Sequence, residues 1–434
     1  MKKSNLLTIL FLTLFCLVQS AQAQITLNNP AWKIEGGETT WFGTGNTERG
    51  GAYNPATGHV LVVSRAVSPR VVILDAANGD SIGVLESINI AGGTFPINEI
   101  GVTEDGQIFA GNLTVDATSS PFKVYRWADE ADSARAVFEA TFSDGGRYGD
   151  AFGVGGSGEA VDVFASGTGN NKIASFGWFG AAPLSDPSFI SVNSGEARGG
   201  IAAVPGEETI WINGFGTATA QIDFVTGDNV ASIPTNVLPT ATMDIAFFRI
   251  GEKSYIAAGP DGAQTYKVID VTDPLSPALV AETESLGSTA NGNQTGFVAY
   301  DSARNHLIVC STNNAIASYS LEGLMTTNVS NADEITPEDF TLLGNYPNPF
   351  NPETVIRYSL PAKSEVTVMI FNQGGQIIRN LISGVQNPGA HKIIWNGRND
   401  HGAQVASGVY IYRVFANTSA GKSYAQSRKM TLLR

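Results

Sequence analysis

The chain has 434 residues and a formal net charge of −14, from 26 Lys and Arg against 40 Asp and Glu. A nucleic-acid-binding protein needs a cationic surface for the phosphates, so this charge disfavours that class. Charged residues make up 15% of the chain and hydrophobic residues 43%, which argues against extensive disorder. There are 48 glycines without a collagen period, so we expect a chain that turns often.

The N-terminus has the pattern of a secretory signal peptide. Two lysines at positions 2 and 3 precede an apolar run from Leu6 to Val18, and Ala21 and Ala23 provide the small residues of a cleavage site. The run is too short to span a bilayer as a helix. We therefore predict a signal peptide over residues 1–23, an exported protein, and no transmembrane segment.

The charge divides the rest of the chain into two parts. Residues 341–434 contain ten Lys and Arg against three Asp and Glu, a net charge of +7, whereas residues 24–340 contain 14 against 37, a net charge of −23. The polar stretch 326–340 lacks helical or strand periodicity and is typical of a linker. We predict one domain over residues 24–325 and a second over residues 341–434.

The first of these domains is a repeat. A strand pattern of small or apolar residues recurs six times at intervals of 44–52 residues, and each copy leads through turns into further apolar runs such as His59–Val63 and Arg70–Asp75. The centres of the six copies lie near Ala52, Gly101, Gly153, Ala202, Ala246 and Phe297. Four short strands in about 40–50 residues is the signature of a β-propeller blade, so we predict an all-β fold with six blades. A β-solenoid is the alternative.

The ends of the propeller are expected to join. The last repeat stops after its third strand, at residues 318–321, and the segment from Ile25 to Ile34 has no first strand of its own. This segment could supply the missing outer strand, and the closure would remove an exposed sheet edge.

The second domain has alternating apolar residues, such as Ile356, Tyr358 and Leu360, that predict half-buried strands of a small β-sandwich. It also contains a series of ordered motifs, which include Tyr346, Pro347, Asn348, Pro349, Phe350, Trp395, Gly408, Tyr410 and Lys429. Through these residues the domain resembles type IX secretion sorting domains, which are similar to the Ig fold of flagellar hook-capping proteins.

This resemblance implies recognition by the outer-membrane secretion machinery. The protein would then be secreted or attached to the outer-membrane surface, through a Sec signal peptide and type IX-like export. The alternative is an Ig-like spacer that is merely retained.

Other motifs give no support for a cofactor. The string Gly153-Val-Gly-Gly-Ser-Gly158 satisfies a dinucleotide fingerprint by letter, but a strand follows it where the fingerprint needs a helix. The four histidines form no metal-spaced pair. Asp-rich turns could hold Ca²⁺, but no EF-hand-like ligand series exists. Cys310, the single cysteine left after cleavage, lies in an apolar strand and is expected in the core.

The candidate ligand-binding surface is one mouth of the propeller. There the loops before the first strands meet the loops that join the second and third strands. The positions before the first strands are Arg49, Glu99, Asp150, Arg198, Asp244 and Gln294, and the facing loops carry Arg65, Asn112, Asn170, Asn213, Asp261 and Asn313. A ring of mixed charges and amides suits hydrogen bonding to a sugar or a peptide, although such loops are also polar because they are wet.

Three functions agree with these observations. The first is non-enzymatic binding of an extracellular glycan or peptide. The second is a secreted hydrolase or lyase of polysaccharides, with Glu99, Asp150 and Asp244 as acid and base. The third is a structural component of the envelope or matrix. We favour binding and predict no catalytic residue and no metal.

Overall fold

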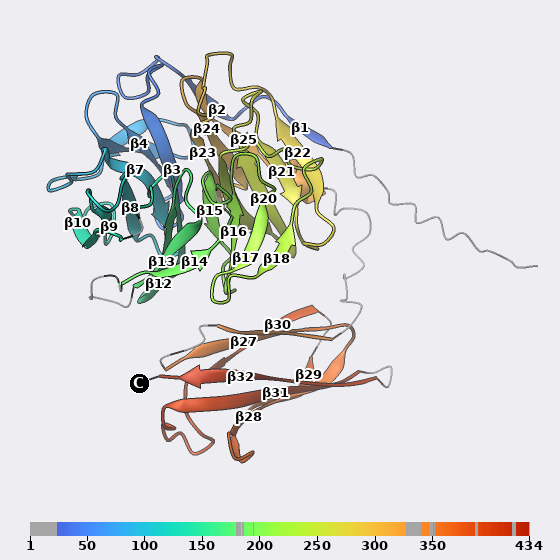
Figure 1. Cartoon of the computed structure of the whole chain (residues 1–434). Coiled ribbons are helices and arrows are strands. Elements are labelled where there is room, and N and C mark those ends of the chain that lie inside the picture. The colour runs from blue at the N-terminus through green and yellow to red at the C-terminus, as the bar shows by residue number, and fades with distance from the viewer. Residues whose placement is uncertain are drawn as a thin grey trace, which may run out of the picture.

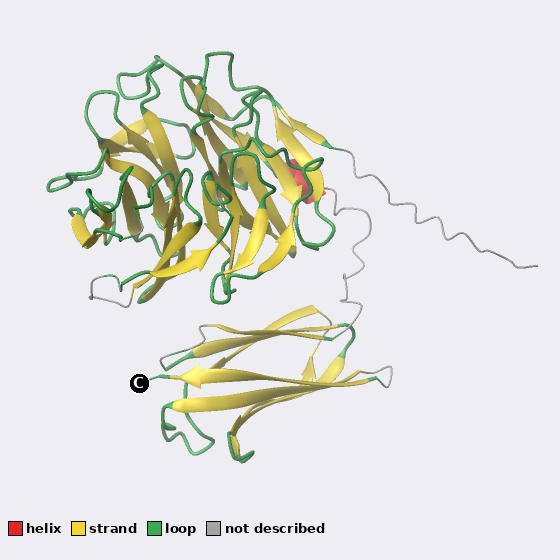
Figure 2. Ribbon diagram, viewed as in Figure 1, coloured by secondary structure: helices red, strands yellow, loops and turns green. Residues whose placement is uncertain are grey.

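The computed structural model describes residues 24–143, 145–178, 184, 186–193, 195–326, 340–346, 350, 352–386, 389–418 and 422–433. The predicted signal peptide, most of the predicted linker, and Pro347, Asn348 and Pro349 lie outside them. The described chain is all-β, apart from the short helix α1 (Glu322–Thr326) (Figure 2). No helix in the described ranges is both long and apolar enough to cross a membrane.

Residues 24–326 form six small sheets in chain order. Sheets 1 to 4 are antiparallel and consist of four consecutive strands each. They are β3 (Glu48–Asn54), β4 (His59–Ser64), β5 (Arg70–Asp75) and β6 (Ser81–Val84); β7 (Phe95–Val102), β8 (Ile108–Leu113), β9 (Phe122–Trp127) and β10 (Arg135–Ala140); β11 (Ala151–Ser157), β12 (Ala160–Ser166), β13 (Lys172–Trp178) and β14 (Ser188–Ser191); and β15 (Gly200–Ala203), β16 (Thr209–Asn213), β17 (Ala220–Asp223) and β18 (Asn229–Ser232).

Sheets 5 and 6 each include a strand from the N-terminal segment. Sheet 5 consists of β19 (Asp244–Ile250), β20 (Lys253–Gly259), β21 (Lys267–Asp270) and β22 (Ala278–Thr283), with β1 (Ile25–Leu27) parallel to β22. Sheet 6 consists of β23 (Gly296–Asp301), β24 (His306–Ser311) and β25 (Ala315–Ser320), with β2 (Trp32–Glu35) antiparallel to β25. The expected outer strand of the last repeat is therefore β2 alone, whereas β1 extends the neighbouring sheet.

The first strands of the six sheets are neighbours. β3 lies beside β7, β7 beside β11, β11 beside β15, β15 beside β19, and β19 beside β23; β23 then lies beside β3, so the succession returns to its start (Figure 1). All six predicted centres fall within these first strands.

Glycine allows the first strands to approach closely. A Cβ atom at Gly101 would lie 2.5 Å from Cγ2 of Val154, and one at Gly51 would lie 2.5 Å from the ring of Phe297. A larger residue at either position would push neighbouring sheets apart.

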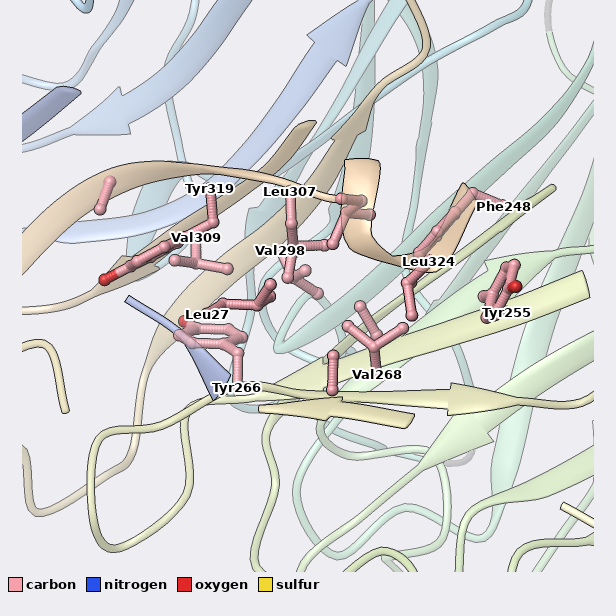
Figure 3. Packing of buried hydrophobic residues seen from close by; sticks show 14 of the residues in the cluster. Leu27, Phe248, Tyr255, Tyr266, Val268, Val298, Leu307, Val309, Tyr319 and Leu324 are labelled. Atoms are coloured by element: carbon pink, nitrogen blue, oxygen red, sulfur yellow. The ribbon is translucent and has the colours of Figure 1, made fainter. Parts of the chain in front are cut away.

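Each interface between neighbouring sheets has its own apolar core. Between sheets 5 and 6, Tyr266, Val268, Val298 and Leu307 pack together, and Leu27 of β1 joins them (Figure 3). Burying each such side chain contributes roughly 1.5–3 kcal/mol. The first residues of the N-terminal segment therefore take part in the core and do more than cover an edge.

The C-terminal residues form a β-sandwich. One sheet has the order β26 (Thr341–Tyr346), β27 (Thr354–Leu360), β30 (Gly389–Trp395), and the other has the order β29 (Ile377–Gln386), β28 (Ser364–Asn372), β31 (Gly408–Thr418), β32 (Ser423–Leu432). The predicted inward positions Ile356, Tyr358 and Leu360 are fully buried. The alternation in the sequence therefore places the core correctly.

Candidate functional site

Five of the six positions predicted at the mouth lie at or just before the beginnings of the first strands, and Glu99 is the fifth residue of the eight-residue strand β7. Arg49, Glu99 and Asp244 are within β3, β7 and β19, and Asp150, Arg198 and Gln294 come one or two residues before β11, β15 and β23. Neighbouring first strands approach closely at two of these positions, because the backbone at Gly50 lies next to Glu99 and that at Gly200 lies next to Asp244. Glu99 therefore lies beside β3, and Asp244 lies beside β15.

Glu99 lies where the charges of several sheets converge. Burial raises the pKa of its carboxyl group well above the usual value, and the negative charges of Asp244 and Asp150 act in the same direction. The positive charges of Arg49 and Arg65 oppose that rise without cancelling it. Glu99 therefore keeps its proton to higher pH than an exposed glutamate does.

Asp244 is a second acid of this kind. Burial raises its pKa to about 7, although its carboxylate accepts a hydrogen bond of 2.9 Å from the backbone N–H of Val298. The six first strands form a closed succession of neighbours, β3, β7, β11, β15, β19 and β23, which we call the ring. Sheets 2 and 5 are opposite each other in this succession, so Glu99 and Asp244 come from opposite strands of the ring. A carboxyl group that titrates near neutrality, as Asp244 does, can exchange protons with a bound molecule.

The arginines of the ring have few partners. The Nε atoms of Arg49 and Arg198 are buried and have no hydrogen-bond partner among the described residues. The guanidinium of Arg198 lies 5.1 Å from the centre of the Phe215 ring, and Phe215 is half exposed. Burial lowers the pKa of Arg49, while the charges of Glu99 and Asp150 counteract that effect.

Arg65 is held more firmly than Arg49. It stacks 3.6 Å above the Phe95 ring and donates to Oδ1 of Asn98 and to the carbonyl of Asn46, both at 3.2 Å. Burial, followed by repulsion from Arg49, lowers its pKa to about 10. The side chain therefore keeps its charge near the ring but already uses its donors.

The negative charge of Asp150 is balanced by the guanidinium of Arg147. Both of its carboxylate oxygens accept from the guanidinium of Arg147 at 2.6 Å, and the N–H of Thr168 donates at 2.8 Å. Burial acts to raise the pKa of Asp150, but these hydrogen bonds outweigh it and hold the pKa below its usual value. Asp150 is thus less suited to act as an acid than Glu99 or Asp244.

The facing loops carry residues that mainly support the backbone. Asp261 pairs with Lys267 at 2.6 Å and also accepts from Thr265. Asn112 accepts from the N–H of Lys123 and donates to the carbonyl of Pro121. These two predicted residues are buried and satisfied by their own loops, which leaves little of them for a ligand.

Four further amides in this region also bind backbone groups. Asn170 donates to the carbonyl of Arg147, Asn213 to that of Thr242, and Asn313 to that of Ala290. Gln294 donates to the carbonyl of Ala241 at 2.7 Å and accepts from the N–H of Gly262 at 3.3 Å. The sequence could not separate these structural amides from the charged residues of the ring, because all occupy polar turn positions.

Two residues were missed by the sequence analysis. Glu48, next to Arg49, is fully buried, and one of its carboxylate oxygens has no partner among the described residues. Phe215 lies under Arg198. The position of Glu48 in a glycine-rich first strand was a signal that the sequence offered. Phe215 is a single aromatic residue in a loop, and its sequence position offered no signal.

No metal site is apparent in the described part of the chain, where no three His, Cys, Asp or Glu side chains are grouped to hold an ion. Cys310 is buried in the apolar core, as predicted, and burial raises the pKa of its thiol well above the usual value. It is therefore unsuited to act as a nucleophile.

The described motif residues of the C-terminal domain lie mainly in and around its core. Phe350 packs 5.4 Å from Trp395, and Trp395 packs 5.1 Å from Tyr410, measured between ring centres. Gly408 begins β31, Tyr346 ends β26, and Lys429 is exposed on β32. Most of these motif residues therefore stabilise the sandwich, while Lys429 is displayed on its surface.

Comparison with known proteins identifies this C-terminal region. Residues 352–420 match the family model of the FlgD Ig-like domain. The hook-capping resemblance of the sequence is thus confirmed for that segment. No curated protein matches the chain.

Two solved structures resemble larger parts of the chain. A DUF4623 family protein from Bacteroides eggerthii DSM 20697 is 17% identical, with a TM-score of 0.50, over 63% of this chain and 71% of that one. PorZ, an essential bacterial surface component of the type-IX secretion system of Porphyromonas gingivalis, is 15% identical, with a TM-score of 0.35. That match covers 88% of this chain and 51% of PorZ. The first likeness shows a shared fold alone.

Proposed function

We propose that the protein is an exported, six-bladed β-propeller that binds an extracellular glycan or peptide at its ring of first strands. The C-terminal Ig-like domain would deliver it by type IX-like secretion to the cell surface or the medium. Binding without catalysis is the function that the ring supports best.

The propeller interpretation is supported by the order of the sheets. Six small sheets follow one another along the chain, their first strands are successive neighbours, and β23 lies beside β3. The N-terminal strand β2 completes the last sheet, as expected for a ring whose ends are joined by one sheet. A solenoid has no reason to bring its last unit beside its first.

The binding interpretation rests on one observation. Charges from Arg49, Arg65, Asp150 and Asp244 all act on Glu99 of sheet 2, although these four residues come from three other sheets. Buried charges that serve only stability are paired and hydrogen-bonded, as Asp261 and Lys267 are. The incomplete pairing at the ring supports a role in recognition.

A hydrolase or lyase is the second candidate, and the two raised carboxyl pKa values favour it. An acid–base mechanism needs one carboxyl group protonated and another ionised near neutral pH. Glu99, with a pKa well above its usual value, would be the acid, and Asp244, with a pKa of about 7, the base.

The delivery interpretation rests on the C-terminal domain. It combines the match to the FlgD Ig-like domain with the sorting-domain motifs at Phe350, Trp395 and Tyr410. Its net positive charge differs from the net negative charge of the N-terminal unit. This difference fits a separate delivery domain that can be attached to different exported proteins.

A screen of the purified protein on glycan and peptide arrays, with and without Ca²⁺, tests the binding function. We expect a saturable ligand whose binding is lost in Glu99→Gln and Asp244→Asn and retained in Glu104→Gln, an exposed control. Conversion of the ligand would establish the enzymatic candidate instead. A ligand that binds all three variants equally would place recognition outside the ring and contradict the proposal.

A further inference from the structure

Two arginines of the ring have unmet hydrogen-bonding capacity. Arg49 on sheet 1 and Arg198 beside sheet 4 occupy corresponding positions on opposite sides of the ring. The Nε atom of each is buried, and neither side chain forms an ion pair within the described ranges. By contrast, Arg147 nearby binds Asp150 through two hydrogen bonds.

Unmet donors of this kind are costly to a fold. A buried donor that loses its water without gaining an acceptor destabilises the protein, and a cationic donor does so more strongly. Such groups are retained where a ligand provides the acceptor. A guanidinium is best satisfied by a carboxylate, whose two oxygens match its planar fork.

The acids of the ring do not supply that acceptor. Burial favours the neutral forms of Glu99 and Asp244, and Asp150 is already occupied by Arg147. In the described ranges no hydrogen bond or ion pair joins either arginine to Glu99 or Asp244, so the two Nε atoms are left without an acceptor although the N-terminal unit as a whole is strongly acidic. The carboxyl groups of Glu99 and Asp244 can form hydrogen bonds with ligand hydroxyls.

Aromatic side chains stand beside two arginines of this region, Arg198 and Arg65. Phe215 is half exposed next to Arg198, and Phe95 lies beneath Arg65. Flat apolar faces of this kind pack against the C–H face of a pyranose ring. A peptide would be held largely through main-chain groups, whereas the buried atoms without a partner here are side-chain atoms of Arg49, Arg198, Glu48 and Asn213.

We propose that the ring binds an acidic oligosaccharide, with the carboxylate of a uronate residue accepting from Arg49 or Arg198 and a sugar face packing on Phe215. This inference rests on the proposed binding function and names its ligand class. The carboxyl groups of Glu99 and Asp244 would then contact the sugar hydroxyls.

The test compares three small ligands by calorimetry with the purified protein at neutral pH. They are trigalacturonate, its carboxyl-reduced counterpart galactotriose, and tri-aspartate as an acidic peptide. We expect trigalacturonate to bind, galactotriose to bind at least about tenfold more weakly, and tri-aspartate not to compete. Added salt should weaken the trigalacturonate complex.

Substitutions of the two arginines test where the carboxylate of the ligand binds. Arg49→Gln and Arg198→Gln should each weaken trigalacturonate binding by about tenfold or more, and Arg135→Gln, at a side chain that is 71% exposed, should leave it unchanged. Arg49→Lys keeps the charge without the fork and should fall in between. A thermal melt of each variant identifies any that fails to fold. If one of the two arginine-to-glutamine variants fails to fold, the affinity of the other variant tests the proposal.

The outcomes separate this inference from the proposed function. Equal binding of trigalacturonate and galactotriose would overturn the role of the carboxylate and leave glycan binding standing. Binding of tri-aspartate alone would overturn the saccharide class and leave peptide binding. Binding of trigalacturonate that both Gln variants retain would overturn the assignment to the two arginines.

Discussion

Glu99 and Asp244 stand on opposite sheets of the ring, yet the charge of Asp244 is the largest electrostatic influence on Glu99. The ring is therefore narrow enough for carboxyl groups three sheets apart to influence each other. Because burial alone raises both pKa values, the repulsion between them makes simultaneous ionisation still less favourable. The two carboxyl groups therefore keep their protons to higher pH than exposed carboxyl groups do.

Stability should depend on the protonation of Asp244. Its folded-state pKa of about 7 lies above the usual 3.8, so its contribution to stability is fully present below about pH 4 and is lost as the pH rises through 7. Asp244→Asn removes this loss. Between about pH 4 and pH 8 the free energy of unfolding of the variant should rise relative to that of the wild type by a few kcal/mol, at most about 4. Urea unfolding at a series of pH values measures the difference, with Glu104→Gln as the control that should follow the wild type.

Asp261 should matter for stability and not for binding. Its carboxylate pairs with the buried Lys267, so Asp261→Asn leaves a buried cation partly uncompensated. The expected cost is about 3 kcal/mol in the free energy of unfolding, with ligand affinity unchanged at temperatures where the variant is folded. A variant of normal stability that loses ligand would instead assign Asp261 to the site.

Gly51 should resist substitution because the neighbouring strand is too close. A Cβ atom there would lie 2.5 Å from the Phe297 ring, whereas one at Gly292 would meet nothing within 4 Å. Gly51→Ala should lower the free energy of unfolding by about 1–3 kcal/mol, and Gly292→Ala should change it little. Equal effects in chemical denaturation would contradict the close contact between β3 and β23.

The C-terminal domain should be required for export and dispensable for folding of the N-terminal unit. No described sheet combines strands of the two parts. Deleting residues 341–434 should therefore leave the protein folded but retained inside the cell envelope, as measured by fractionation of the native host. Unchanged secretion of the shortened chain would favour the spacer alternative.

The sequence predicts the strands well because their alternation follows directly from burial. Ile356, Tyr358 and Leu360 point inward as expected, and all six first strands begin near their predicted centres. It could not predict that β1 joins sheet 5 in parallel with β22, because that pairing depends on where the ring brings the N-terminus. The sequence of a short segment does not indicate which distant strand will lie beside it.

The candidate site was only partly accessible to sequence reasoning. Asp244 and Asp261 both look like acidic turn residues, and the structure distinguishes them through Lys267, which pairs with Asp261 and with Glu282 and not with Asp244. Arg49 and Arg147 differ in the same way, since Asp150 binds Arg147. Which charges remain unpaired is decided by three-dimensional contacts that residue spacing does not encode.

The most direct test of the ligand-binding account is a crystal structure of the protein with the ligand selected on the arrays. We predict electron density for that ligand at the ring, within hydrogen-bonding distance of Arg49 and Asp244. Density bound on an outer strand or at the C-terminal domain, with the ring occupied only by water, would contradict it.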